Sequence, residues 1–208
     1  PIFPMGGSNF SATLKLTPPY SLVNGVDYGN LENLPEFQDD NGDPIQSKID
    51  QERFKWLEFY KFKFNAEWFT RLVDKLVLRT NVELGYLGSY NNERGVIPFE
   101  RFFLGGDGLG AFSLDGREAI ALRGYPNQSL STQDGGNIYN KFSLELRYPI
   151  TLKSQASIYG LTFLEGGASY DSFRAYNPFQ LNRSAGLGIR IFMPAFGLLG
   201  IDFGHGFD

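Results

Sequence analysis

Hydrophobic and polar residues alternate along much of the chain, and this period of two predicts β-strands. In residues 9–17, Phe10 and Leu14 fall on one face while Thr13 and Lys15 fall on the other. The same alternation recurs in six further runs, which cover residues 54–68, 75–86, 138–150, 156–170, 184–191 and 199–207. The pattern therefore predicts an all-β chain with seven strands.

The predicted strands are long. Several runs extend for about ten residues, whereas soluble strands usually have about five or six and membrane-spanning strands about 9 to 11. The second run keeps an aromatic face from Trp56 to Trp68, although Glu58 departs from the alternation. Charges at alternate positions suit the wet interior of a barrel whose apolar face meets lipid. A soluble β-sandwich also alternates and stays open as an alternative on pattern alone.

The connections between the predicted strands alternate in length. Short ones near residues 70–74, 151–154 and 194–197 alternate with long ones over residues 24–53, 91–136 and 171–182. All long connections therefore lie at one end of the sheet, as in outer-membrane barrels with short periplasmic turns and long external loops.

Composition supports this interpretation and excludes several others. The chain has 20 Phe, 11 Tyr, 2 Trp and 25 Gly, which favours an all-β protein rich in turns. A net charge of −4 argues against nucleic acid as a partner, and the absence of cysteine excludes disulfides and thiolate metal sites. The most apolar stretch, residues 191–201, contains Pro194 and is far shorter than the roughly 20 residues of a spanning helix.

Seven strands cannot close a membrane barrel of the usual even-numbered kind, and lipid does not tolerate an open sheet edge. The chain begins at Pro1 and shows no secretory signal. We therefore expect an antiparallel transmembrane β-barrel of which this chain supplies a part. The missing strands are expected before Pro1, and the region after Asp208 stays open as a second place for them.

Several motifs resemble the BamA family of outer-membrane protein assembly factors. "PFERFFLGG" (98–106) followed by "LRGYP" (122–126) is similar to the family's signature loop, whose hallmark is a Val-Arg-Gly-Phe/Tyr tetrad. "GNIYNKFSLELRYPI" (136–150) resembles the strand that follows this loop. "FLEGGASYD" (163–171) resembles the F-x-D-x-G strand motif, with Glu165 in place of the aspartate.

The resemblance covers nearly the whole chain. Residues 1–22 are similar to a ninth strand and residues 184–208 to the final hairpin of a sixteen-stranded barrel. Two features depart from the family pattern: Leu122 replaces the usual valine, and the segment 107–121 separates the two loop motifs more widely than expected. The path of that segment is therefore open.

The resemblance implies a location and a set of partners. A family member would lie in the bacterial outer membrane and help other β-barrels to fold and insert there, without enzymatic activity or a cofactor. Its partners would be upstream POTRA domains, the missing strands of its own barrel, nascent outer membrane proteins, accessory lipoproteins and the lipid bilayer.

The candidate site is the loop over residues 91–136, folded back into the barrel. A buried Arg123 would need a carboxylate, because an unpaired charge removed from water is costly. The family counterpart of Glu165 is the partner of the loop arginine, and Gly124 and Tyr125 complete the tetrad. Together with Arg123 and Glu165 they form the expected structural loop lock. Glu145 and Asp202 also fall on polar faces and are alternative partners.

Other functions stay open with less support. A two-partner secretion pore or another outer-membrane transport channel would share the strand pattern. A hydrolase would need a nucleophile and a base, and the single histidine, His205, falls on the lipid-facing parity. "DDNGDP" (39–44) lacks the glycine and glutamate of an EF-hand and is expected to be an external loop without metal. "GGDGLG" (105–110) lacks the Lys-Ser/Thr of a phosphate-binding loop and is expected to be a flexible loop.

Overall fold

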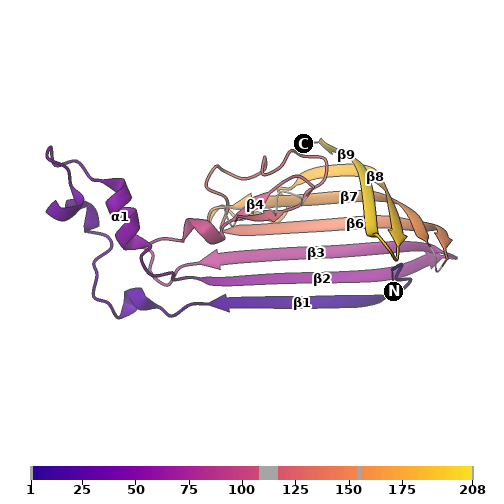
Figure 1. Ribbon diagram of the computed structural model, residues 1–208, viewed down its shortest axis with the longest axis horizontal. Helices are drawn as coiled ribbons and strands as arrows, with labels where there is room; N and C mark the ends of the chain where they lie inside the picture. Colours follow the sequence, from indigo (N-terminus) through magenta and orange to yellow (C-terminus); the bar gives the residue numbers. More distant parts are fainter. Residues whose placement is uncertain (1, 108–116, 154–155, 208) are drawn as a thin grey trace.

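Seven long strands form one antiparallel sheet in the order β1-β2-β3-β6-β7-β8-β9 (Figure 1). The computed structural model describes residues 2–107, 117–153 and 156–207. The strands are β1 (Gly7–Leu16), β2 (Tyr60–Val73), β3 (Leu76–Gly88), β6 (Ile138–Leu152), β7 (Ser157–Tyr170), β8 (Asn182–Met193) and β9 (Gly197–Phe207). The sequence prediction of seven antiparallel strands of a partial barrel is confirmed.

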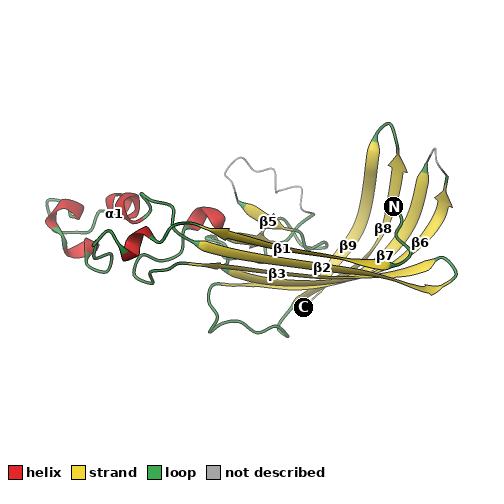
Figure 2. Ribbon diagram, turned by 90° about the horizontal axis from the view of Figure 1, so that it is seen from below, coloured by secondary structure: helices red, strands yellow, loops and turns green. Residues whose placement is uncertain are grey.

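Shorter elements lie in the long connections. A parallel pair, β4 (Phe102–Leu104) and β5 (Glu118–Ile120), belongs to the connection between β3 and β6. In Figure 2, β5 stands off one face of the twisted sheet. The remaining elements are η1 (Tyr20–Leu22), η2 (Leu31–Asn33), η3 (Pro35–Phe37), α1 (Gln46–Arg53) and η4 (Pro98–Glu100). Among the described residues, none of these helices has the length and apolar character needed to cross a membrane.

Connection lengths alternate as the sequence predicts. Tight turns join β2 to β3 and β8 to β9, while long connections leave the opposite end of the sheet after β1, β3 and β7. The connection after β1 carries α1 and extends beyond the strands at the left of Figure 1. We call the end with the long connections the loop end and the other the turn end.

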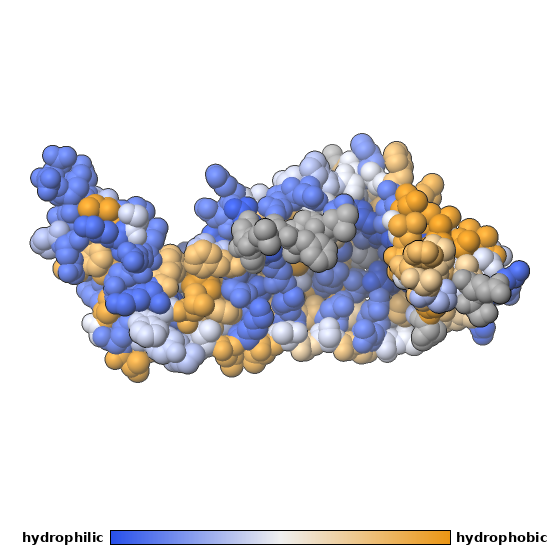
Figure 3. All heavy atoms as spheres, in the orientation of Figure 1, coloured by the Kyte–Doolittle hydropathy of each residue, from blue (hydrophilic) through white to orange (hydrophobic). Residues whose placement is uncertain are grey.

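The two faces of the sheet differ in polarity. Alternate side chains of every long strand form a broadly exposed apolar face, with Leu14 62%, Ile150 64% and Leu187 63% exposed. The intervening positions carry charged and polar groups, several of which are buried, among them Lys61, Glu145 and Glu165. Figure 3 looks onto this second face and shows hydrophilic residues across its middle, with apolar residues near the turn end. We call it the inner face, because a closed barrel would turn it inward.

The second strand begins later than the sequence predicts. β2 starts at Tyr60, whereas the alternation suggested a start at residue 54. Just before it, the carboxylate of Glu58 accepts hydrogen bonds from the main chain and hydroxyl of Ser21 at 2.7 and 2.5 Å. The guanidinium of buried Arg94 donates to the carbonyl oxygens of Trp56 and Glu58. These residues therefore belong to the loop structure rather than the sheet.

Three apolar clusters organise the loops and the inner face. Tyr28, Leu31 and Ile49 form the centre of the first long connection, so α1, which the sequence analysis did not predict, is anchored by Ile49. Phe3, Val77, Tyr159, Leu161 and Phe163 line the inner face toward the turn end. The third cluster packs the β3–β6 connection onto the sheet through Phe59, Leu87, Ile97, Phe102, Leu104, Ile120, Leu122 and Tyr139.

Candidate functional site

Arg123 lies on the inner face at the end of an apolar run that fixes its position. Leu122 is fully buried in the cluster beneath the loop and forms an isolated bridge with Gly106. The next residue, Gly124, has φ of +92°, a conformation that a residue with a side chain rarely adopts. The chain therefore turns sharply after Arg123, and the arginine is held between a buried leucine and a strained turn.

The Arg123 guanidinium contacts carboxylates from three strands. Nη2 lies 2.6 Å from Oε1 of Glu165 and 2.7 Å from Oε1 of Glu145, and Nε donates to the same Glu165 oxygen at 3.0 Å. Nη1 lies 3.3 Å from Oδ2 of Asp202. The main-chain N–H of Arg123 donates to the second oxygen of Glu165 at 2.9 Å. Glu165 thus fixes both the side chain and the backbone of this residue.

Strand register explains why these carboxylates meet. Glu145 pairs with Phe163, two residues before Glu165 on β7, so both acids project from the inner face on neighbouring strands. Asp202 faces the same side from β9. The centroid of the Phe163 ring lies 3.8 Å from the Arg123 guanidinium carbon, and the ring supplies a cation–π contact.

Further cations surround the cluster. Arg147 donates to Glu145 at 2.5 Å, and Arg190 donates to both oxygens of Asp202 at 2.6 and 2.7 Å. The Ser143 hydroxyl donates to Glu165 at 3.1 Å. Each acid therefore has a partner besides Arg123.

The electrostatic environment keeps Arg123 charged. Burial alone would lower the pKa of its guanidinium, but the hydrogen bonds and negative charges of Glu165 and Glu145 outweigh burial and raise that pKa above its ordinary value. The arginine side chain is only 13% exposed. A permanent cation is thus held among acids, an arrangement suited to fixing a loop.

Glycines on β9 make room for the residues after Arg123. The N–H of Gly206 donates to the carbonyl oxygen of Gly124 at 3.0 Å, which joins the loop to the last strand through the main chain. A Cβ at Gly206 would lie 2.6 Å from the Tyr125 ring. The Tyr125 hydroxyl donates to the carbonyl oxygen of Arg183 at 2.8 Å. Tyr125 therefore packs beneath the loop against β8 and β9.

All six residues selected from the sequence lie in this one place. Glu165, Glu145 and Asp202 were expected as alternatives, whereas the structure brings all three to Arg123 at once. Sequence reasoning did not identify Phe163 or Arg190 as members. Their signal was present in the alternation, because Phe163 falls on the same face of β7 as Glu165, and Arg190 falls on the same face of β8 as Ser184.

Other candidate features lie apart from this cluster. In "DDNGDP" the carboxylate of Asp39 accepts hydrogen bonds from the main-chain N–H groups of Asn41 and Asp43, which closes the turn internally. His205 is exposed, and its position in β9 alternates with that of Asp202, so it belongs to the outer face. Residues 108–110 of "GGDGLG", and most of the segment 107–121, lie outside the described residues.

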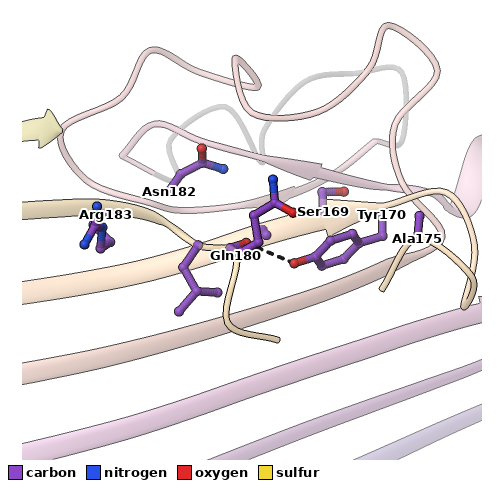
Figure 4. Close-up of a pocket in the computed structure, with 8 residues that line it drawn as sticks. Ser169, Tyr170, Ala175, Gln180, Asn182 and Arg183 are labelled. Atoms are coloured by element: carbon purple, nitrogen blue, oxygen red, sulfur yellow. Dashed lines mark hydrogen bonds between the residues drawn. The ribbon is translucent and has the colours of Figure 1, made fainter. Parts of the chain in front are cut away.

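A separate polar pocket of about 460 Å³ lies at the loop end of β7 and β8 (Figure 4). The Tyr170 hydroxyl lies 3.0 Å from the carbonyl oxygen of Gln180, and the Asn182 amide donates to the carbonyl oxygen of Gly167. These groups brace the β7–β8 connection. The lining residues are Ala168, Ser169, Tyr170, Ala175, Gln180, Leu181, Asn182 and Arg183.

Comparison with known proteins agrees with this architecture. The Omp85 superfamily domain matches residues 40–208. Among solved structures, BamA from Haemophilus ducreyi lacking POTRA domains 1–3 matches with a TM-score of 0.65 and 20% sequence identity. The match covers 99% of this chain and 36% of that one, so the chain spans about a third of the length of the BamA structure. No curated protein matches. The chain therefore belongs to the Omp85 superfamily, and its sheet is part of a BamA-like outer-membrane β-barrel.

Proposed function

We propose that this chain is the C-terminal part of the barrel of an assembly factor that folds and inserts other β-barrels into the bacterial outer membrane. The observation that carries the proposal is the loop lock, which we define as Arg123 together with Glu145, Glu165 and Asp202. It fixes a long loop against the inner face of the sheet, and the motifs of this loop resemble the signature loop of the BamA family.

The proposed role needs no covalent chemistry. The loop lock would act by stabilising one arrangement of the β3–β6 connection and of strands β6, β7 and β9, from which its acids project. In this proposal the partners are upstream POTRA domains, the remaining strands of the barrel, nascent outer membrane proteins, accessory lipoproteins and the bilayer. The exposed apolar face of the sheet supports contact with lipid.

A second candidate is a transport channel such as a two-partner secretion pore. The charged inner face favours it, because charged residues of both signs suit a water-filled passage. Against it, the loop occupies that face beside the cluster of Arg123, so a conducting state would require the loop to move.

The test is reconstitution of the full-length protein into liposomes with a urea-denatured outer-membrane barrel as substrate. The assembly proposal expects faster folding of the substrate than in empty liposomes, and loss of most of that acceleration in Arg123→Ala. Arg174→Ala, which removes an exposed arginine from the β7–β8 connection, is the matched control and keeps the acceleration. Strong steady ion conductance without any acceleration of folding would instead establish the channel.

A further inference from the structure

A second group of ion pairs holds the β4–β5 region of the loop and does not include Arg123. Lys61 of β2 is 1% exposed, and its Nζ lies 2.9 Å from Oε2 of Glu100 and 2.5 Å from Oε2 of Glu118. It also donates to the carbonyl oxygen of Glu100 at 2.7 Å. An ammonium group has three N–H donors, so these three acceptors satisfy it completely. The buried charge therefore depends entirely on the loop.

The sheet alone would not tolerate this arrangement of lysines. Lys15 on β1 is the direct cross-strand partner of Lys61, and Lys63 faces the same side two residues further along β2. Like charges opposite each other destabilise a sheet. The Oε2 atom of Glu100 also lies 3.5 Å from Nζ of Lys15, and Glu118 also pairs with Lys63. The loop thus supplies negative charge to this part of the sheet, where three lysines lie close together.

The fold of the loop delivers both glutamates to one lysine. Glu100 ends η4, while Glu118 begins β5, which pairs in parallel with β4 so that Phe102 lies opposite Glu118. The Phe102 ring centroid lies 4.5 Å from Nζ of Lys61, and this ring belongs to the apolar cluster beneath the loop. Two distant loop segments therefore meet at Lys61 because β4 and β5 join them.

We propose that Lys61 is a second positioning residue of the loop, which with Glu100 and Glu118 forms a front anchor that fixes the β4–β5 region to β2 separately from the loop lock. The loop lock engages β6, β7 and β9, whereas the front anchor engages β2, so the loop spans most of the width of the sheet.

Hydrogen exchange of the full-length protein in lipid nanodiscs tests the front anchor. Lys61→Met keeps the length of the side chain and removes its charge, so amides of β4 and β5 should exchange about tenfold faster or more. The Gly206 amide, which donates to Gly124 near the loop lock, should keep its rate. Lys15→Met is the matched control, because it removes a 52% exposed lysine that faces the same glutamate, and it should leave β4 and β5 unchanged.

Two further variants keep the test decisive if Lys61→Met fails to fold. Glu118→Gln preserves shape and should also accelerate exchange in β4 and β5, while Lys61→Arg retains the charge and should restore most of the protection. The proposal is overturned if neither Lys61→Met nor Glu118→Gln changes exchange there, or if Lys15→Met has the same effect as Lys61→Met. Hydrogen exchange does not depend on assembly activity. If exchange confirms the front anchor but the protein accelerates no substrate folding, only the proposed function is refuted.

Discussion

The loop is held at two places by ion pairs of opposite polarity. At the loop lock the loop supplies the cation, Arg123, and the wall supplies carboxylates from three strands. At the front anchor the wall supplies Lys61, and the loop supplies Glu100 and Glu118. The charges that the loop supplies are therefore opposite in sign to those of the sheet residues that it contacts at each place.

The two places differ in how firmly they define orientation. A guanidinium is planar and offers a fixed fork of donors, so the contacts of Arg123 specify direction as well as distance. An ammonium is a compact point charge with rotatable donors, so Lys61 fixes position with less control of angle. The loop lock therefore sets the geometry of the loop, while the front anchor holds the β4–β5 region against the sheet.

The largest effect is expected for Arg123→Ala. It removes every side-chain contact to Glu165, Glu145 and Asp202 and leaves the buried acids without their central cation. Breaking a buried ion pair from one side costs about 3 to 5 kcal/mol, and a wet barrel interior places the expected loss near the lower value. The measurement is the free energy of unfolding of the full-length protein in detergent, determined by urea titration.

Arg123→Lys is the control that keeps the positive charge but changes the geometry of the donors. Lysine lacks the planar, forked set of N–H groups, so this variant should recover less than half of the stability lost in the alanine variant. Full recovery by lysine would show that the loop lock is a simple charge contact, and the contrast with the front anchor would disappear.

A smaller effect is expected for Gly124→Ala. An alanine there would hold a strained φ of +92° and place its Cβ 2.8 Å from the main-chain carbon of His205. Gly197→Ala is the matched control, because Gly197 has a similar φ of +84° and open space around the added carbon. Strain alone costs about 1 kcal/mol or more, and the clash should add to it only at Gly124. Equal losses of unfolding free energy in the two variants would contradict the close approach of the loop to β9.

The smallest effect concerns pH and the front anchor. Burial acts to raise the pKa of Glu118, but hydrogen bonds from Lys61 and Lys63 outweigh it and lower that pKa below its ordinary value of 4.5. Because the folded pKa is depressed, the stability that Glu118 contributes is present above pH 4.5 and is lost as pH falls through the folded value. The contribution is expected to be about 1 kcal/mol or less, as for a partly exposed ion pair.

The difference in unfolding free energy between the wild type and Glu118→Gln measures this contribution. It should be constant from pH 5 to pH 7 and shrink toward zero in more acidic solution. A difference that stays constant into strong acid would show that the Glu118 charge has no role in stability.

Much of the sheet could be predicted from the sequence, because alternation directly reports which side chains face lipid and which face inward. The alternation within each strand already placed Glu145, Glu165 and Asp202 on the polar face. The distance between them could not be predicted, because it depends on cross-strand register. Register also explains why the three acids act together rather than as alternatives.

The loop structure was less predictable for a different reason. Residues 54–59 continue an alternating pattern, yet the buried pair of Glu58 with Ser21 and the donation from Arg94 keep them out of the sheet. The helix α1 and the β4–β5 pair are short and depend on tertiary packing, so local pattern carries little signal for them. The alternation in β2 puts Lys61 on the polar face, but its loop partners are 39 and 57 residues away.

The most direct test of the loop lock is a double-mutant cycle on Arg123→Ala and Glu165→Ala, read as the free energy of unfolding of the full-length protein. Because the two side chains contact each other, the losses should be strongly non-additive, with a coupling energy of about 1 to 3 kcal/mol. In the Arg123→Ala background, Glu165→Ala should cost less than in the wild type, because only the hydrogen bonds from the main-chain N–H of residue 123 and from the Ser143 hydroxyl remain to be lost. Additive losses, with coupling below about 0.5 kcal/mol, would contradict the pairing on which the proposed function is built.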